Sequence, residues 1–178
     1  MAPKGIEMNY TLHYTSPFGG ITLASDGDAL TGLWFDGQRY FPNLYGNETG
    51  KNSLPVFVQT KEWLDIYFTG RDPGFTPPIK LLTTQFRMEV CEIMLTIPFG
   101  STSTYGEIAA IISERREGGK MSAQAVGGAV GHNPISLIIP CHRVIGSDGS
   151  LTGYAGGTEL KRKLLKMEGA AFKTGDDV

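Results

Sequence analysis

The start of the chain alternates short segments rich in β-branched and aromatic residues with turns that contain glycine. Segments of this kind are typical of β-strands, and glycine marks the turns between them. The predicted strands are Asn9–Tyr14, Ile21–Ser25 and Leu30–Phe35. The turns are Ser16–Gly20 and Asp26–Asp28, and a long loop rich in Gly, Asn and Pro follows over Tyr40–Leu54. This order predicts a β-meander in the first part of the chain.

Farther along, apolar residues recur at spacings of three and four, the period of a helix that buries one face. Pro55–Phe68 is the first predicted helix, and Thr84–Thr96 is the second. The expected apolar face of the first comprises Val58, Leu64, Ile66, Tyr67 and Phe68. The expected core-facing residues of the second are Phe86, Val90, Ile93, Met94 and Ile97. The proline-containing connection Arg71–Pro78 marks the predicted boundary between a domain of residues 1–78 and a domain of residues 79–178.

Two short helices joined by a turn follow the second helix. Thr104–Glu107 has the spacing of a capping box and predicts a helix through Ile112. A charged turn over Glu114–Gly119 leads to a helix over Ser122–Val130, for which the serine is the expected N-cap. This pair is a helix-turn-helix candidate. The last predicted helix is Glu159–Met167.

The second helix of this pair consists largely of small residues. They are Ala123, Ala125, Gly127, Gly128, Ala129 and Gly131. Two glycines inside a helix cost roughly 2 kcal/mol of helix propensity relative to alanine, so their presence needs a reason. Small side chains allow another helix of the same protein to pack closely, and they equally allow close approach to a separate surface. Composition alone leaves these two interpretations open.

The segment with the most distinctive chemistry is the apolar run Ile135–Ile139 and the residues that follow it. Pro140 ends the run because proline has no N–H to donate, and Cys141 and His142 come next. A thiol with a pKa of about 8.5 is only slightly ionised at neutral pH, but an adjacent imidazole can take its proton. An isolated pair of this kind is more often a buried thiol and a core histidine. Cys91, with no histidine nearby, is predicted to be structural.

The composition and the charge exclude several classes of protein, but they do not identify a function. The net charge is −2, with 7 basic against 10 acidic residues in positions 1–100 and 9 against 8 in positions 101–178. Any DNA contact must therefore come from local geometry. Two cysteines make neither a disulfide framework nor a cysteine-rich zinc site. Met1–Tyr10 has no apolar core of a signal peptide, and no segment has the length of a membrane span, so we expect a cytoplasmic protein without metal or cofactor.

Several spaced blocks of the second half resemble one known family. The blocks are the Ala-Val-Gly-Gly-Ala segment from Ala125, Asn133-Pro134, Pro-Cys-His-Arg-Val from Pro140, and Leu-Thr-Gly-Tyr ending at Tyr154. They resemble the active-site region of the methylated-DNA–protein-cysteine methyltransferases, also called O6-alkylguanine-DNA alkyltransferases. The resemblance implies an α/β (α+β) fold, with a ribonuclease-H-like N-terminal domain and a mostly helical C-terminal domain that contains a helix-turn-helix.

The resemblance also implies an activity and a set of residue roles. The alkyl group of O6-alkylguanine would move irreversibly to Cys141, with His142 as the base and Glu168 orienting His142. Glu168 could instead be an ordinary solvated acid at a helix end. Asn133 would hold the turn under the recognition helix, Tyr105 would contact the lesion base or phosphate, and the pocket would be lined by Val130 and Tyr154. Each molecule would act once, and O4-alkylthymine stays open as a second substrate.

The implied partner is double-stranded DNA carrying alkylated guanine, bound by a monomer through the minor groove after the base is rotated out. The residues implied to face DNA are Ser122, Ala123, Gln124, Ala125, Gly127, Gly128 and Gly131. Gln124 departs from the family pattern, in which many relatives have an arginine that fills the gap left by the flipped base.

Three other functions remain alternatives. A lesion-binding relative would lack the cysteine, a transcription regulator would carry a second sensor cysteine cluster, and a Cys-His hydrolase would need an oxyanion hole.

Overall fold

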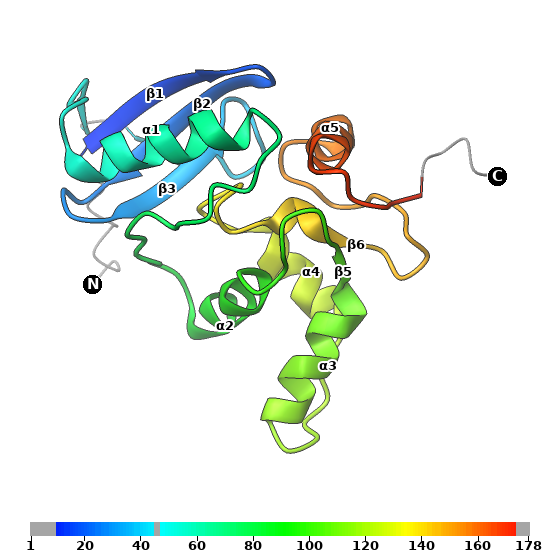
Figure 1. Cartoon of the computed structure of the whole chain (residues 1–178). Coiled ribbons are helices and arrows are strands. Elements are labelled where there is room, and N and C mark those ends of the chain that lie inside the picture. The colour runs from blue at the N-terminus through cyan, green and yellow to red at the C-terminus, as the bar shows by residue number, and fades with distance from the viewer. Residues whose placement is uncertain (1–9, 45–46, 174–178) are drawn as a thin grey trace. The chain divides into compact units, whose positions relative to one another are not determined.

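The computed structural model describes residues 10–44 and 47–173. The chain forms two compact units, the first comprising Met1–Leu82 with Pro134–Ser136, and the second comprising Thr83–Asn133 with Leu137–Val178. The first unit contains the β-sheet and one helix, and the second contains the remaining helices (Figure 1). The fold is therefore mixed α and β, as the sequence predicts. The domain boundary after residue 78 stays a prediction.

The first unit is built on a four-stranded sheet. Its strands are β1 (Tyr10–Ser16), β2 (Gly19–Ser25), β3 (Leu30–Phe35) and β4 (Glu48–Thr49), in the order β3-β2-β1-β4. β2 pairs antiparallel with both β1 and β3, so the predicted meander is confirmed. β4 is parallel to β1, and the prediction of a plain loop there is wrong. Two exposed residues are too few to produce a periodic pattern. Asn9, the predicted first strand residue, lies outside the described residues.

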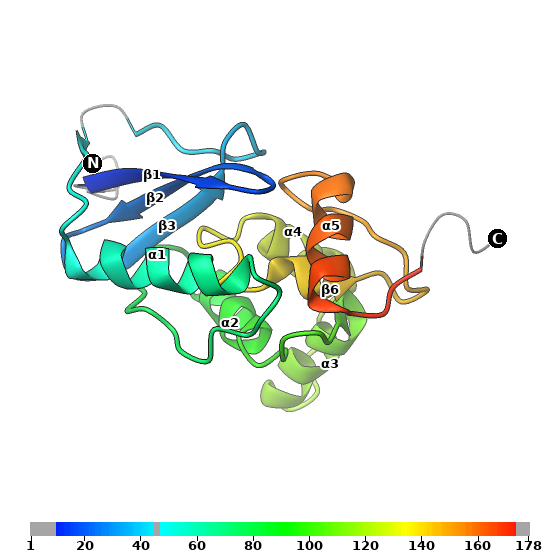
Figure 2. The same ribbon diagram turned by 45° about the horizontal axis from the view of Figure 1, so that its top comes forward.

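Helix α1 (Pro55–Tyr67) packs along one face of this sheet, against β2 and β3 (Figure 2). Its buried residues are Val56, Phe57, Thr60, Trp63, Leu64 and Tyr67. The predicted apolar face is therefore wrong in part, because Val58 is 51% exposed and Ile66 is only half-buried. Trp63 stacks on Tyr67, with ring centroids 5.0 Å apart. The largest aromatic residues decide which face is buried, and the isolated valine is left in solvent.

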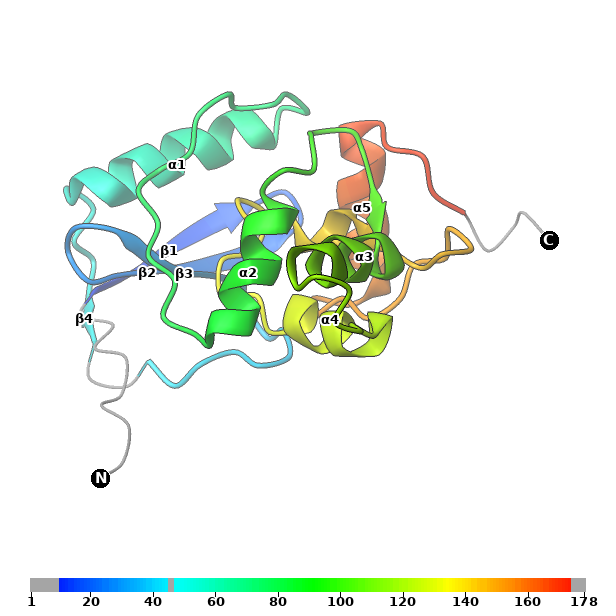
Figure 3. The same ribbon diagram turned by 90° about the horizontal axis from the view of Figure 1, so that it is seen from below.

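The second unit is mostly helical. Its elements are α2 (Gln85–Met94), β5 (Ser103–Thr104), α3 (Tyr105–Arg115), α4 (Ala123–Gly131), the 3₁₀ helix η1 (Cys141–Arg143), β6 (Val144–Ile145) and α5 (Thr158–Glu168). α4 contacts both α2 and α3, and Figure 3 shows α3 and α4 side by side. β5 and β6 form a short parallel pair. The predicted helix-turn-helix is therefore α3 and α4.

Local capping explains why these helices begin where they do. The Thr104 hydroxyl accepts a hydrogen bond from Glu107 N, while the Glu107 side chain accepts one from Thr104 N, which is the predicted capping box. The Ser122 hydroxyl accepts from Ala125 N at the start of α4. Both caps are confirmed. α3 continues to Arg115, three residues beyond the predicted end at Ile112. The first two residues of the predicted turn Glu114–Gly119 are therefore helical.

The apolar run before Pro140 is buried but is not a continuous strand. Ile135 forms an isolated parallel bridge with Leu33, and Ser136 N donates to Leu33 O at 2.9 Å. Leu137 then has a φ of 68°, a left-handed conformation that is uncommon for leucine and ends the extended backbone. The chain turns again at Pro140 and enters η1. These turns determine how the following side chains are presented.

Candidate functional site

Cys141 and His142 lie on the single turn of η1, in the second unit. Arg143 N donates to Pro140 O at 3.0 Å, and the N–H of Val144 donates to Cys141 O. Adjacent side chains on an extended strand would point to opposite faces. On a 3₁₀ helix they differ by about 120° because there are three residues per turn. The turn at Pro140 therefore allows the thiol and the imidazole to face a common site.

The Glu168 carboxylate is the centre of a buried hydrogen-bond cluster at the end of α5. Its side chain has 0% exposure, so it is not a solvated helix-end acid. His142 Nε2 lies 2.7 Å from Oε1, and Arg143 makes a two-point contact through Nε at 2.9 Å and Nη2 at 3.0 Å. Gly100 N donates to Oε2 at 3.2 Å. The structure thus brings together His142 and Glu168, which are 26 positions apart in the sequence.

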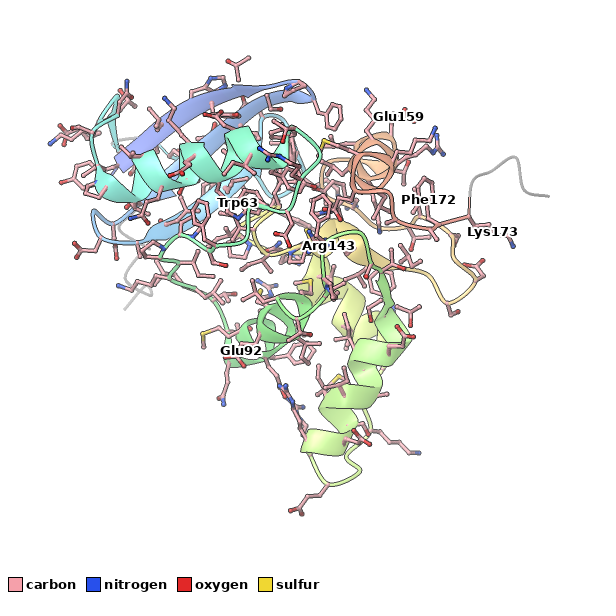
Figure 4. All side chains as sticks on the ribbon, viewed as in Figure 1. Trp63, Glu92, Arg143, Glu159, Phe172 and Lys173 are labelled. Carbon is pink, nitrogen blue, oxygen red and sulfur yellow. The ribbon has the colours of Figure 1, made fainter. Side chains whose placement is uncertain are left out.

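Arg143 is a residue of this site that the sequence analysis left without a role. Besides Glu168, it donates through Nη1 to Ile97 O at 2.7 Å, and its guanidinium lies 5.7 Å from the centre of the Phe99 ring. Figure 4 labels it in the interior of the second unit, where it is 8% exposed. The available signal was its place directly after the cysteine and histidine. A guanidinium is always charged and matches a carboxylate at two points, so Arg143 holds Glu168 ionised.

The protonation states follow from these contacts. Burial raises the pKa of Glu168, but the hydrogen bonds donated by His142 and Arg143, together with the charge of Arg143, outweigh it and lower the pKa to about 2. Burial lowers the pKa of His142, and Glu168 offsets only part of that effect. His142 is therefore neutral at physiological pH. Because Nε2 faces an ionised carboxylate, Nε2 carries the proton and Nδ1 is the basic nitrogen.

The Cys141 thiol is itself buried, with 5% exposure. Burial raises its pKa above the ordinary value of a thiol, and the Asn133 side chain, the charge of Lys161 and the backbone N–H groups of Cys141 and His142 offset part of this effect. Asn133 also donates through Nδ2 to Ile139 O at 2.8 Å and so ties the turn before Cys141 to the end of α4. These polar groups favour the thiolate, whereas burial disfavours it.

Cys91 has a different environment. It is 1% exposed on α2, and burial raises its pKa to about 12. The charges of Cys141 and Glu92 raise the pKa of Cys91 further, and no hydrogen bond or cation contributes to lowering it. Cys91 therefore stays a protonated thiol near neutral pH, which agrees with the structural role that the sequence predicts.

Tyr105, Val130 and Tyr154 are the residues predicted to contact the substrate. Tyr105 begins α3, and its hydroxyl donates to Thr152 O at 2.9 Å. Val130 is buried at 3% exposure and Tyr154 at 8%. The structure thus places Tyr105 against the loop that leads to Tyr154, while a common pocket lined by Val130 and Tyr154 stays a prediction.

The surface of α4 distinguishes the two interpretations of its small residues. Val126, Ala129 and Val130 form its buried face, whereas Ser122–Ala125 and Gly128 are exposed. A Cβ atom added at Gly128 would meet no atom within 4 Å among the residues that the structure describes, and the same holds at Gly131. Packing inside the chain therefore does not require glycine at these two positions. Approach to a separate surface becomes the better explanation.

No group of three or more His, Cys, Asp or Glu side chains that could hold a metal ion occurs within residues 10–44 and 47–173. In the same described part of the chain, no helix is long and apolar enough to cross a membrane.

Comparison with known families gives two adjoining matches. Residues 8–81 match the model described as "6-O-methylguanine DNA methyltransferase, ribonuclease-like domain". Residues 85–170 match the model described as "6-O-methylguanine DNA methyltransferase, DNA binding domain". Together these matches cover most of the chain and include the cluster around Cys141.

Individual relatives agree with the family models. The chain is 40% identical over 160 residues to a methylated-DNA–protein-cysteine methyltransferase of Haemophilus influenzae, covering 89% of this chain and 86% of that protein. Identity to the protein of the same name from Mycobacterium tuberculosis is 44% over 161 residues, covering 88% and 92%. Among solved structures, Mycobacterium tuberculosis OGT in complex with DNA superposes with a TM-score of 0.78 at 38% identity, covering 90% of this chain and 92% of that one.

The first prediction concerns Glu168 and the stability of the second unit. Its pKa is 4.5 in an unfolded chain and about 2 in the fold, so its contribution is fully present above pH 4.5 and is lost as the pH falls toward 2. A shift of this size corresponds to about 3 kcal/mol. We expect Glu168→Gln to lower the free energy of unfolding by about that amount at pH 7, and by progressively less toward pH 3, in urea titrations.

The matched control is Glu159→Gln, at an exposed position of the same helix. Glu159 pairs only with Arg162 and its side chain is 69% exposed, so we expect a change of about 0.5 kcal/mol or less. A Glu168→Gln penalty that does not vary with pH would contradict the assigned ionisation.

Proposed function

Because the chain belongs to the methylated-DNA–protein-cysteine methyltransferase family, we propose that it repairs DNA by moving the alkyl group from guanine O6 to its own Cys141. The observation that carries the proposal is the cluster at η1, where a buried thiol adjoins a neutral histidine held by an ionised carboxylate. This is the nucleophile, base and orienting group of activated nucleophilic catalysis. The groups that shift the pKa of Cys91 all raise it, and no histidine is among them, so Cys141 is the proposed acceptor.

The proposed step is a single displacement. The Cys141 thiol proton passes to Nδ1 of His142, and the sulfur attacks the alkyl carbon. A carbon–sulfur bond forms as the bond from carbon to guanine O6 breaks, and the electron pair of that bond stays with guanine. Guanine then gains a proton at its ring nitrogen, so overall the thiol proton replaces the alkyl group. Glu168 stabilises the imidazolium while it exists, as the carboxylate does in serine hydrolases.

The product explains why each molecule would act once. A thioether has no good leaving group, and no cofactor takes part in the step. Alkylated Cys141 therefore remains alkylated, and the protein is consumed in proportion to the lesions it repairs.

The exposed face of α4 is the proposed DNA contact. A minor groove is about 6 Å wide and excludes helices that carry long side chains. Gly128 and Gly131 leave open space above the helix, and Ser122–Ala125 are exposed beside them. The target oxygen lies inside the base stack, so the guanine must be rotated out at a cost of a few kcal/mol. A solved relative in complex with DNA supports DNA as the partner.

Gln124, which is exposed near the start of α4, is the residue that we assign to the gap left by the flipped base. Glutamine can reach into the duplex and form hydrogen bonds, but it has neither the charge nor the stacking plane of an arginine.

We also propose that the protein acts as a monomer and that it works in the cytoplasm, where a free thiol persists.

The second prediction tests the acceptor. Incubation with a duplex that contains O6-methylguanine should add the mass of one methylene group to the intact protein, and peptide mapping should place it on Cys141. Cys141→Ser should bind the duplex and transfer nothing, because an alcohol is a far weaker nucleophile than a thiolate. Cys91→Ser is the matched control and should transfer at the wild-type rate. Methyl on Cys91, or repeated turnover with release of methanol, would refute the proposal.

The third prediction tests the α4 surface by opposite effects on folding and binding. Gly128→Ala should raise the free energy of unfolding by about 1 kcal/mol, since alanine is the better helix former and its Cβ has room. The same substitution should weaken binding to duplex DNA, and Gly128→Leu should weaken it further. Thermal unfolding and fluorescence anisotropy measure the two effects.

Gln59→Leu, at an exposed position of α1 in the other unit, is the control for added apolar surface and should leave DNA affinity unchanged. Undiminished binding by Gly128→Leu would show that this face of α4 does not meet DNA.

A further inference from the structure

Lys161 is a fully buried cation in α5 to which the mechanism above assigns no role. Its exposure is 0%, and its Nζ donates to Val144 O at 2.5 Å and to Thr152 O at 2.9 Å. Lysine is rarely buried, because an ammonium group loses its hydration there. Two carbonyl acceptors satisfy donors but supply no opposite charge. A buried ammonium in this position therefore calls for an anion nearby.

The two carbonyls belong to two segments that follow Cys141 in the chain. Val144 directly follows η1, and its own N–H donates to Cys141 O. Thr152 lies in the loop that leads to Tyr154, and its carbonyl also accepts a hydrogen bond from the Tyr105 hydroxyl at 2.9 Å. Lys161 Nζ lies 5.8 Å from the centre of the Tyr105 ring. Lys161 thus ties the backbone after Cys141 to the Thr152 carbonyl, which also accepts the hydrogen bond of the Tyr105 hydroxyl.

The charges around the cluster identify the anion. From η1 the titratable or charged groups are Cys141, His142 and Arg143; from α3 it is Tyr105; and from α5 it is Glu168. Glu168 is already paired with Arg143 at two points. His142 is neutral, and burial raises the pKa of Tyr105, which keeps its phenol protonated. Cys141 is the remaining group of this set that can become an anion beside the ammonium.

We propose that Lys161 is a positioning residue that stabilises the Cys141 thiolate by its charge and fixes the hydroxyl of Tyr105 through the shared Thr152 carbonyl. This inference rests on the proposed transfer to Cys141. Lys161 does not touch the alkyl group; it acts through the sulfur and through the backbone around it.

The titration of Lys161 agrees with this geometry. Burial lowers its pKa to about 8, and the thiolate of Cys141 acts in the opposite direction to raise it. In return, the charge of Lys161 lowers the pKa of Cys141 and also that of His142. Such coupling is reciprocal, so it can be measured from either partner.

The fourth prediction separates this role from a merely structural one. In Lys161→Met the pKa of Cys141 should rise by about one unit or more, which is the usual effect of an opposite charge close by. The thiolate absorbance near 240 nm, measured against Cys141→Ser as the blank, reports that pKa alone. Single-turnover methyl transfer should show the same displacement of its acid limb and fall about tenfold or more at pH 7. Lys166→Met, at an exposed position of α5, should change neither quantity.

A second measurement leaves Lys161 intact and covers the case in which Lys161→Met fails to fold. The pKa of the Lys161 ammonium, followed by NMR of its labelled side chain, should be lower in Cys141→Ser than in the wild type, because the thiolate is gone. Equal Lys161 pKa values in the two proteins, or an unchanged Cys141 titration in Lys161→Met, would overturn the inference. A wild-type protein that transfers no methyl group would instead refute the proposed function.

Discussion

The buried carboxylate of Glu168 is the constraint on which the rest of the site depends. It receives hydrogen bonds from His142, Arg143 and Gly100 N, and Arg143 in turn donates to Ile97 O. The end of α5, the turn η1 and the segment after α2 are therefore joined at one charge. Removing one partner from a buried ion pair typically costs about 3–5 kcal/mol, because the other charge is left uncompensated. The position of Cys141 follows from this arrangement, since it precedes two of the bonded residues on the same turn.

The charged groups of the site form two pairs, and the imidazole of His142 is neutral. Arg143 balances Glu168, and Lys161 is available to balance the thiolate of Cys141. Burial keeps the His142 imidazole neutral and leaves it able to accept a proton. A salt-bridged Glu168 orients His142 without making it permanently cationic, which would prevent it from acting as a base. Arg143 thus acts on the position of Glu168, whereas Lys161 acts on the nucleophile Cys141.

Much of the fold could be predicted from local signals in the sequence. Thr104 with Glu107 and Ser122 are caps that act within a few residues, and the strands carry their own periodicity. The face of α1 could not be predicted in full, because burial there depends on the sheet against which the helix packs and not on the number of apolar residues. The strand β4 was missed because its pairing with β1 is a long-range event.

The candidate site shows the same division. Cys141 and His142 stand out by adjacency, and Glu168 enters by resemblance; the structure brings Glu168 within 2.7 Å of His142, while their roles stay proposals. Arg143 and Lys161 were not identified, because charged residues in a sequence are expected at the surface. Lys161 in particular lies in a helix that is otherwise rich in exposed charges, and only the fold shows that its side chain turns inward.

The most direct test of the account is the protonation state of the His142 ring. The nitrogen chemical shifts of labelled His142 at neutral pH should show a neutral ring, with the proton on Nε2, which faces Glu168, and with Nδ1 unprotonated. In Glu168→Gln the preference for this tautomer should weaken, since the carboxylate that fixes it is gone. An imidazolium at neutral pH, or a neutral ring with its proton on Nδ1, would contradict the assignment of His142 as the base for Cys141.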